Sequence, residues 1–192
     1  MKKLTRIRIV NNAPVVLWFT VACAAALILS TATNGLSDRL LFSVYRSSLT
    51  DPLTYIRFFG HVIGHANIGH FMSNMMLLVV VGPMLEEKYG SKDLLTIMIL
   101  TAFTTGLFHF IVFPGTMLLG ASGIVFAFIL LASFTQYKDG TLPITFIVVA
   151  VLYIGNQIYD GLFISDNVSN ITHIIGGVIG TFFGLILNKK AN

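Results

Sequence analysis

Apolar residues are gathered into six long runs, and the short stretches between the runs carry most of the charges. The runs are Pro14–Gly35, Ile68–Leu85, Leu94–Phe113, Gly123–Tyr137, Leu142–Leu162 and Ile171–Leu187. A helix needs about 20 predominantly apolar residues to cross the hydrocarbon core of a bilayer, which is about 30 Å thick. The pattern therefore predicts an all-α membrane protein with six transmembrane helices.

The composition is typical of a membrane protein and argues against a separate soluble domain. Of the 192 residues, 55% are hydrophobic and only 10% are charged, and the mean hydropathy is +0.84. Soluble globular domains carry about a quarter of charged residues. We expect a single integral membrane domain over residues 1–192, without a separate soluble domain.

Basic residues are distributed unequally between the two sets of loops. One set, with the two termini, holds nine of them: Lys2, Lys3, Arg6, Arg8, Lys88, Lys92, Lys138, Lys189 and Lys190. The other set holds Arg39, Arg46 and Arg57. By the positive-inside rule, we expect both termini in the cytoplasm. Separately, we expect a multi-pass protein of a prokaryotic plasma membrane. The net charge of +4 then reflects topology and contact with anionic lipid, and gives no reason to expect nucleic acid.

The first external connection, from Leu36 to about Asn67, is far longer than the other loops and contains aromatic, apolar and arginine residues. A loop of this length in a compact domain usually has structure or function of its own. We predict a long structured loop that lies in or on the outer leaflet as short amphipathic helices.

Four polar side chains stand near the predicted external ends of the runs. His70 and Asn74 are four residues apart, on one face of the second helix. Ser122 opens the fourth run, and His173 comes early in the sixth. Each could be a structural hydrogen-bonding group between helices. Polar groups at membrane depth are costly, however, and four at one end of the helices favour a functional site.

The fourth run is short for a membrane span. Gly123–Tyr137 would give about 22 Å of helix at 1.5 Å per residue, against a core of about 30 Å. The backbone before Ser122 must then dip into the bilayer, which is tolerated only next to protein or a water-filled cavity. We therefore expect Ser122 at the floor of an outward-facing, wet cavity.

Small residues predict that the fourth and sixth helices touch. Gly176 and Gly180 follow His173 at helical spacing, and Gly123 and Ala127 follow Ser122. Such small-residue faces let helix backbones approach closely. That approach would bring the His173 imidazole within hydrogen-bond reach of the Ser122 hydroxyl, which is the arrangement of a nucleophile and its base.

The same position suits stabilisation of an oxyanion. Ser122 stands at a helix N-terminus, where backbone N–H groups favour an anion. Asn74 and His70 could add side-chain donors from the second helix. The nearest acidic residue before His173 is Asp166, in the preceding loop. We therefore predict a dyad of Ser122 and His173 rather than a triad with an acid.

These pieces resemble the rhomboid family of intramembrane serine proteases. Gly120-Ala121-Ser122-Gly123 matches the family's G-x-S-G, His70 to Asn74 matches its H-x-x-x-N, and His173 with Gly176 and Gly180 matches the last-helix motif. The likeness extends over roughly Arg57 to Gly184. It implies a six-helix rhomboid-like bundle.

The resemblance also implies a role for each matched residue. Ser122 would be the nucleophile and His173 the base, and His70, Asn74 and the Ser122 backbone N–H would form the oxyanion hole. Gly120, Gly123, Gly176 and Gly180 would serve packing at the site. The substrates would be single-span membrane proteins, cut at or near the external membrane boundary.

Two positions depart from the family's common pattern. Phe126 stands one turn after the serine, where a tyrosine is frequent; it can stack on His173 but donates no hydrogen bond. The first loop reads Ile56-Arg57 instead of Trp-Arg. Neither change removes a group that the reaction needs.

Other functions remain open. A catalytically inactive relative would bind membrane clients without cutting them, although such relatives characteristically lack the serine or the histidine. A haem or metal carrier could use His61, His65, His70 and His173, but would leave the Ser, Asn and Gly set unexplained. A proton-coupled transporter is poorly supported, since Asp160 is the one acidic residue inside a run. We interpret His61 and His65 as loop structure.

No cofactor is expected. The chain carries neither a Walker-type loop nor an H-E-x-x-H motif. Cys23, its single cysteine, lies within the first run and cannot form an intramolecular disulfide or a cysteine-based metal cluster.

Overall fold

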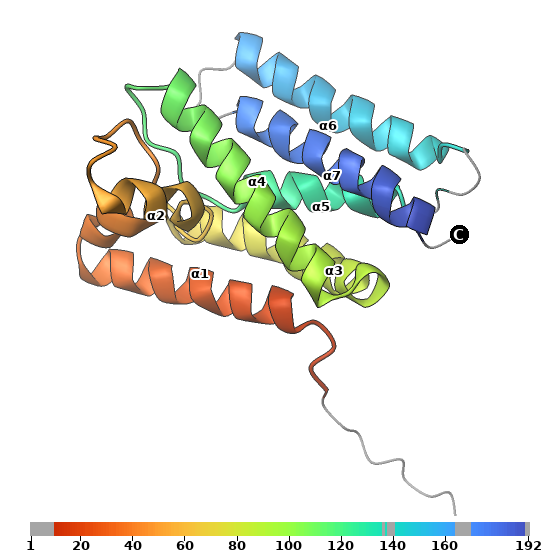
Figure 1. Ribbon diagram of the computed structural model, residues 1–192, viewed down its shortest axis with the longest axis horizontal. Coiled ribbons are helices and arrows are strands. Elements are labelled where there is room, and N and C mark those ends of the chain that lie inside the picture. Colours follow the sequence, from red (N-terminus) through yellow and green to blue (C-terminus); the bar gives the residue numbers. More distant parts are fainter. Residues whose placement is uncertain (1–9, 136, 138–140, 164–169, 191–192) are drawn as a thin grey trace, which may run out of the picture.

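The computed structural model describes residues 10–135, 137, 141–163 and 170–190. Within these residues the regular elements are helices (Figure 1): α1 Pro14–Ala32, the π-helix η1 Asp38–Phe42, α2 Pro52–Gly60, α3 Ile68–Tyr89, α4 Ser91–Val112, α5 Ser122–Ser133, α6 Ile144–Phe163 and α7 Asn170–Lys190. The predicted all-α class is confirmed for this part of the chain. Residues 1–9, Lys138 and Asp166 lie outside the described residues, as does the side chain of Asp160.

Among the residues that the structure describes, four helices are long and apolar enough to cross a membrane: α1, α3, α4 and the Asn170–Asn188 part of α7. The helix α5 and the Ile144–Tyr153 part of α6 are apolar but shorter. The predicted count of six spans therefore stays a prediction.

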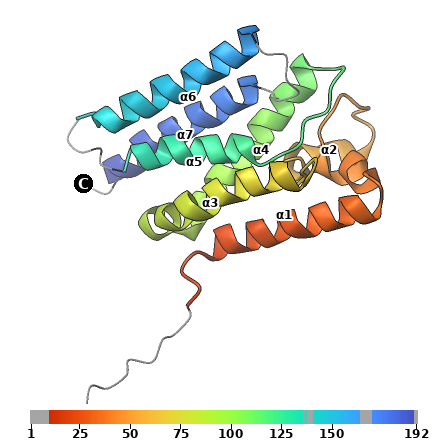
Figure 2. The ribbon, with the colours of Figure 1, turned by 180° about the vertical axis from the view of Figure 1, so that it is seen from behind.

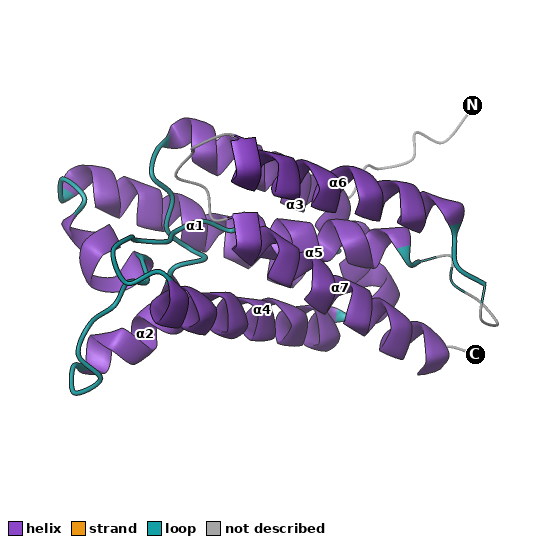
Figure 3. Cartoon of the chain, turned by 90° about the horizontal axis from the view of Figure 1, so that it is seen from above, coloured by secondary structure: helices purple, strands orange, loops and turns teal. Residues whose placement is uncertain are grey.

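The helix α5 lies at the centre of the bundle, in contact with α3, α4, α6 and α7. Figures 1 and 2 show α6 and α1 on opposite outer sides, with α6 beside α7 and α1 beside α3. From above, α5 lies among the other helices (Figure 3). Its side chains are mostly buried, whereas Trp18 on α1 is 67% exposed. A buried central helix and exposed apolar side chains on an outer helix are compatible with a protein surrounded by lipid.

The end of α5 differs from the prediction. The helix ends at Ser133 and not at Tyr137, so its 12 residues span about 18 Å at 1.5 Å per residue. Phe134 closes the last turn and packs its ring against Phe146 of α6, with ring centroids 4.0 Å apart. The apolar character of Phe134 thus reflects a contact between helices rather than a longer helix.

The connection between α1 and α3 contains η1 and α2 and is organised around a buried arginine. Arg57 is 2% exposed, and its guanidinium donates to Asp51 at 2.7 Å, Ser47 at 3.1 Å and the Leu40 carbonyl at 3.3 Å. It also lies over the Tyr45 ring. The Arg57 hydrogen bond lowers the pKa of Asp51. These bonds connect α2 to η1 and to the segment between η1 and α2. The position of this connection relative to the membrane stays a prediction.

A buried glutamate joins α3 to α1. Glu86 accepts from the backbone N–H groups of Val15 at 3.0 Å and Val16 at 3.1 Å, and the Ser91 hydroxyl donates to it at 2.6 Å. A carboxylate at a helix N-terminus pairs with unsatisfied N–H groups and with the helix dipole. This contact lies in the part of α3 that continues past the predicted end at Leu85.

Candidate active site

Ser122 and His173 lie side by side at the start of two neighbouring helices. Ser122 is the first residue of α5, and His173 stands in the first turn of α7. His173 Nε2 lies 2.8 Å from Ser122 Oγ, which is a normal hydrogen-bond distance. The hydroxyl of a half-buried serine and the imidazole of a buried histidine can therefore exchange a proton directly.

Two glycines of α7 allow this approach. A Cβ atom on Gly176 would lie 2.1 Å from the carbonyl oxygen of Gly123, and one on Gly180 would lie 2.0 Å from that of Ala127. Real Cβ atoms essentially never come so close to another atom. The backbones of α5 and α7 thus touch directly at the residue that follows Ser122.

The ring of His173 is held on its face by Phe126. The two rings stack with centroids 4.4 Å apart and planes 6° apart. Phe126 in turn meets Tyr153 of α6 edge-on, with centroids 5.3 Å apart. Phe126 therefore orients the imidazole by stacking, without donating a hydrogen bond to it.

His70 and Asn74 of α3 lie beside Gly120, two residues before Ser122. A Cβ on Gly120 would lie 2.7 and 2.8 Å from Cε1 and Nε2 of the His70 ring, and 3.9 Å from Asn74 Nδ2. Gly120 also has φ +131°, a conformation that favours glycine. The structure thus brings the α3 pair to the backbone that leads into Ser122, and Gly120 serves the approach of His70.

Backbone hydrogen bonds hold this leading segment in place. Val44 and Leu118 exchange two N–H···O bonds of 2.9 Å each, and the Gly120 N–H donates to the His61 carbonyl at 2.8 Å. The partners come from the α1–α3 connection and from the turn after α2. Sequence reasoning missed these contacts, because every residue offers the same backbone groups and no residue pattern marks them.

His61 and His65 are both buried next to the start of α3. His61 Nε2 lies 3.3 Å from the Thr105 hydroxyl, and His65 Nδ1 lies 3.0 Å from the Ile63 carbonyl. Burial lowers the pKa of both imidazoles to about 4, so they are neutral at pH 7. In the part of the chain that the structure describes, no three His, Cys, Asp or Glu side chains are grouped as metal ligands would be.

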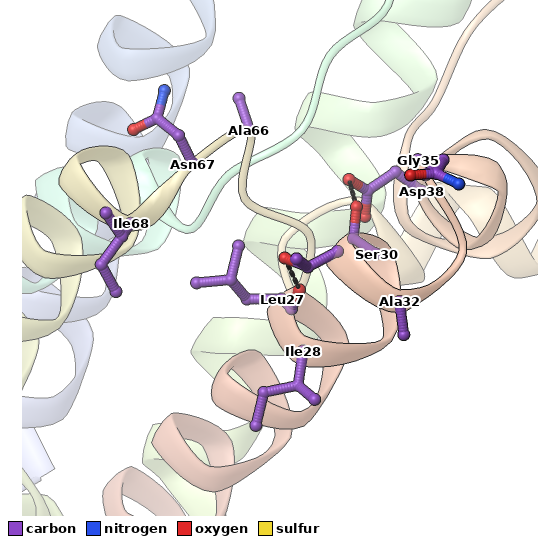
Figure 4. Close-up of a pocket in the computed structure, with 11 residues that line it drawn as sticks. Leu27, Ile28, Ser30, Ala32, Gly35, Asp38, Ala66, Asn67 and Ile68 are labelled. Carbon is purple, nitrogen blue, oxygen red and sulfur yellow. Dashed lines mark hydrogen bonds between the residues drawn. The ribbon is translucent and has the colours of Figure 1, made fainter.

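A pocket of about 910 Å³ lies elsewhere, between the end of α1 and the start of α3 (Figure 4). Apolar side chains such as Leu27, Ile28 and Ile68 line it together with Asp38, whose carboxylate accepts from the Ser30 hydroxyl. None of the predicted site residues lines this pocket. The candidate active site is therefore defined by the contacts around Ser122, and not by this pocket.

The comparisons with known proteins agree on one family. The family model described as "Rhomboid domain" matches residues 52–190. The chain is 28% identical to Rhomboid-related protein 1 of Caenorhabditis elegans over 144 residues, which are 68% of this chain but only 39% of that protein. It is 23% identical to Rhomboid protease GlpG of Haemophilus influenzae over 159 residues, 81% of this chain and 82% of that protein. With its long apolar helices, this chain is an integral membrane protein that belongs to the rhomboid family.

Proposed function

We propose that the chain is an intramembrane serine endopeptidase that cleaves single-span membrane proteins at or near the external membrane boundary. The observation that carries the proposal is the 2.8 Å contact between Ser122 Oγ and His173 Nε2. A serine hydroxyl becomes a useful nucleophile when a neutral imidazole can take its proton. Membership in a family that includes a protein named as a rhomboid protease supports the same reaction.

The first half of the reaction forms an acyl-enzyme. The Ser122 O–H donates to His173 Nε2, and Oγ attacks the carbonyl carbon of the scissile peptide as the proton moves to the imidazole. The tetrahedral intermediate then collapses as His173 returns this proton to the leaving amine. Phe126 stacks on the imidazole, and this contact favours the same ring plane for both transfers.

The negatively charged oxygen of the tetrahedral intermediate must be stabilised by hydrogen-bond donors. The Ser122 N–H is at the N-terminus of α5, where backbone N–H groups have no partner inside the helix. Asn74 and His70 lie beside Gly120 and would add side-chain N–H donors. Donors of this kind stabilise the transition state more than the substrate.

The second half of the reaction hydrolyses the ester. A water molecule gives a proton to His173 Nε2, and its oxygen attacks the acyl carbon. When this second tetrahedral intermediate collapses, His173 returns the proton to Ser122 Oγ, which restores the hydroxyl and frees the new carboxyl terminus. Water must therefore reach the serine. The 12-residue α5, about 18 Å long against a core of about 30 Å, supports a site below the external surface, which water would have to reach from outside.

A labelling experiment tests the proposal. A fluorophosphonate probe should label the wild-type protein in detergent, and Ser122→Ala and His173→Ala should abolish the labelling. In liposomes, single-span substrates should be cleaved equally well with and without EDTA, because no step uses a metal. Cleavage that is lost with the chelator would contradict the serine mechanism.

A catalytically inactive membrane-client binder is the second candidate. It predicts capture of the same substrates without cleavage and without reaction of Ser122 with the probe. The preserved contact between Ser122 and His173 favours the protease.

A further inference from the structure

The His70 imidazole is held by packing rather than by hydrogen bonds of its own ring. In the described residues, neither ring nitrogen of His70 has a hydrogen-bond partner, whereas its backbone N–H donates to Asn67 at 2.9 Å. Gly120 approaches the ring so closely that a Cβ would lie within 2.8 Å of Nε2. A half-buried imidazole without such partners can turn about two side-chain torsions unless its neighbours prevent it.

The other neighbour is His65. The two imidazole rings meet edge-on, with centroids 5.2 Å apart and planes 65° apart, and His65 meets Phe71 in the same way at 5.5 Å. His65 is 0% exposed, so it has little freedom to move away. The ring of His65 therefore packs against the ring of His70 and restricts its rotation.

A specific hydrogen bond sets the orientation of His65 itself. Its Nδ1 lies 3.0 Å from the carbonyl oxygen of Ile63, so Nδ1 carries the proton and donates. Its Nε2 is then an acceptor, and it is buried without a partner in the described part of the chain. Leaving a buried polar atom without a hydrogen bond is unfavourable, and a leucine or phenylalanine at this position would avoid that loss. A histidine at this position therefore needs a reason beyond packing.

We infer that His65 is a positioning residue for the oxyanion hole, because its anchored ring holds the His70 imidazole against the Gly120 backbone. This inference rests on the proposed function, in which His70 donates to the developing oxyanion. The turn that carries His65 also supplies the His61 carbonyl to the Gly120 N–H at 2.8 Å. One turn of the chain thus positions both the His70 side chain and the backbone that leads to the nucleophile.

A double-mutant cycle tests the catalytic consequence. His65→Leu removes the anchored ring and should lower kcat about tenfold to a hundredfold with little change in KM, since His70 acts on the transition state. In the His70→Ala background the same substitution should lower kcat less than about twofold further. His65→Phe keeps the aromatic edge but loses the donor to Ile63, so it should restore part of the activity.

A matched control separates positioning from a loss of stability. His61 is buried in the same turn, but its ring lies against Thr105 of α4. His61→Leu should lower the melting temperature, and its effect on kcat should be equally large in the wild-type and in the His70→Ala background. An additive effect of His65→Leu with His70→Ala would overturn the inference.

A spectroscopic measurement tests the contact without any catalysis. In protein labelled with ¹³C,¹⁵N-histidine, the signals that His70→Ala removes belong to His70. Both His65→Leu and His65→Phe should shift or broaden these signals, and His61→Leu should leave them in place. Unchanged His70 signals in both His65 variants would overturn the inference even if cleavage is observed. Wild-type protein without Ser122-dependent cleavage would instead contradict the proposed function, and the His70 signals would still decide whether His65 holds the ring.

Discussion

Replacing Gly176 with alanine should separate the two helices that carry Ser122 and His173. The added Cβ would lie 2.1 Å from the Gly123 carbonyl oxygen, 2.9 Å from its carbonyl carbon and 3.1 Å from its Cα. All three atoms belong to the backbone of α5, so no side chain can turn aside to relieve the clash. The helices themselves must move.

The size of the movement follows from these distances. Ordinary contact with a Cβ begins at 3.4 Å, so the helices must separate by about 1.3 Å at this point. An increase of that size would take the 2.8 Å contact between Ser122 and His173 beyond the range of a useful hydrogen bond. A misplacement of about 1 Å in a reacting pair can cost on the order of a hundredfold in rate. The same overpacking costs about 1–3 kcal/mol of stability.

The assay compares Gly176→Ala with Gly177→Ala in the same detergent. A Cβ on Gly177 would meet Leu130 side-chain atoms at 3.6 Å, which is ordinary contact. Alanine is better than glycine inside a helix by about 1 kcal/mol, so Gly177→Ala should keep its activity and melt at the same or a higher temperature. Gly176→Ala should lose about a hundredfold in kcat and melt at a lower temperature.

The result that would refute this reasoning is a Gly176→Ala variant with wild-type kcat and melting temperature. The backbones of α5 and α7 would then not be in contact at Gly123, and the geometry assigned to the serine and histidine would be wrong. Loss of stability with full activity at a permissive temperature would show that the packing of Gly176 does not position the dyad.

Three further measurements follow from the structure. Asn74→Ala should lower kcat more than it raises KM, by up to about 10²–10³-fold if no other donor compensates; a change confined to KM would place Asn74 in substrate binding. Glu86→Gln weakens the carboxylate contact with the first N–H groups of α1 and should cost about 1–2 kcal/mol of stability, with kcat in the folded protein unchanged. Burial lowers the pKa of His61 and His65 to about 4, so only the unfolded chain takes up their protons between pH 6.5 and 4. The melting temperature should therefore fall as the pH drops through this window, and less steeply in His61→Phe.

The positions of the helices were predictable because a membrane imposes a strong and local constraint. Each long apolar run in the sequence coincides with a helix, since backbone groups in an apolar environment must be satisfied within the helix itself. The contact of α5 with α7 was equally predictable from the spacing of Gly176 and Gly180. Both predictions rest on helical periodicity and residue size, which can be read directly from the sequence.

The ends of the helices were less predictable, because tertiary contacts decide them. Phe134 looks like a continuation of α5, yet its ring packs on Phe146 and the helix has already ended. Glu86 looks like a loop residue, yet it is buried on the N-terminus of α1 and α3 continues through it. In both cases a partner distant in sequence satisfies the residue.

The contacts around Ser122 were decided by the tertiary structure alone. The Val44–Leu118 pair and the bond from the Gly120 N–H to the His61 carbonyl join backbone atoms that every residue possesses. His65 lies in the loop between α2 and α3, as the sequence predicts, but no pattern in the sequence marks the contact of its ring with the ring of His70. A sequence can mark a serine, a histidine and the glycines between them by residue type. It cannot mark which carbonyl or ring will meet them, because those contacts depend on the path of the whole chain.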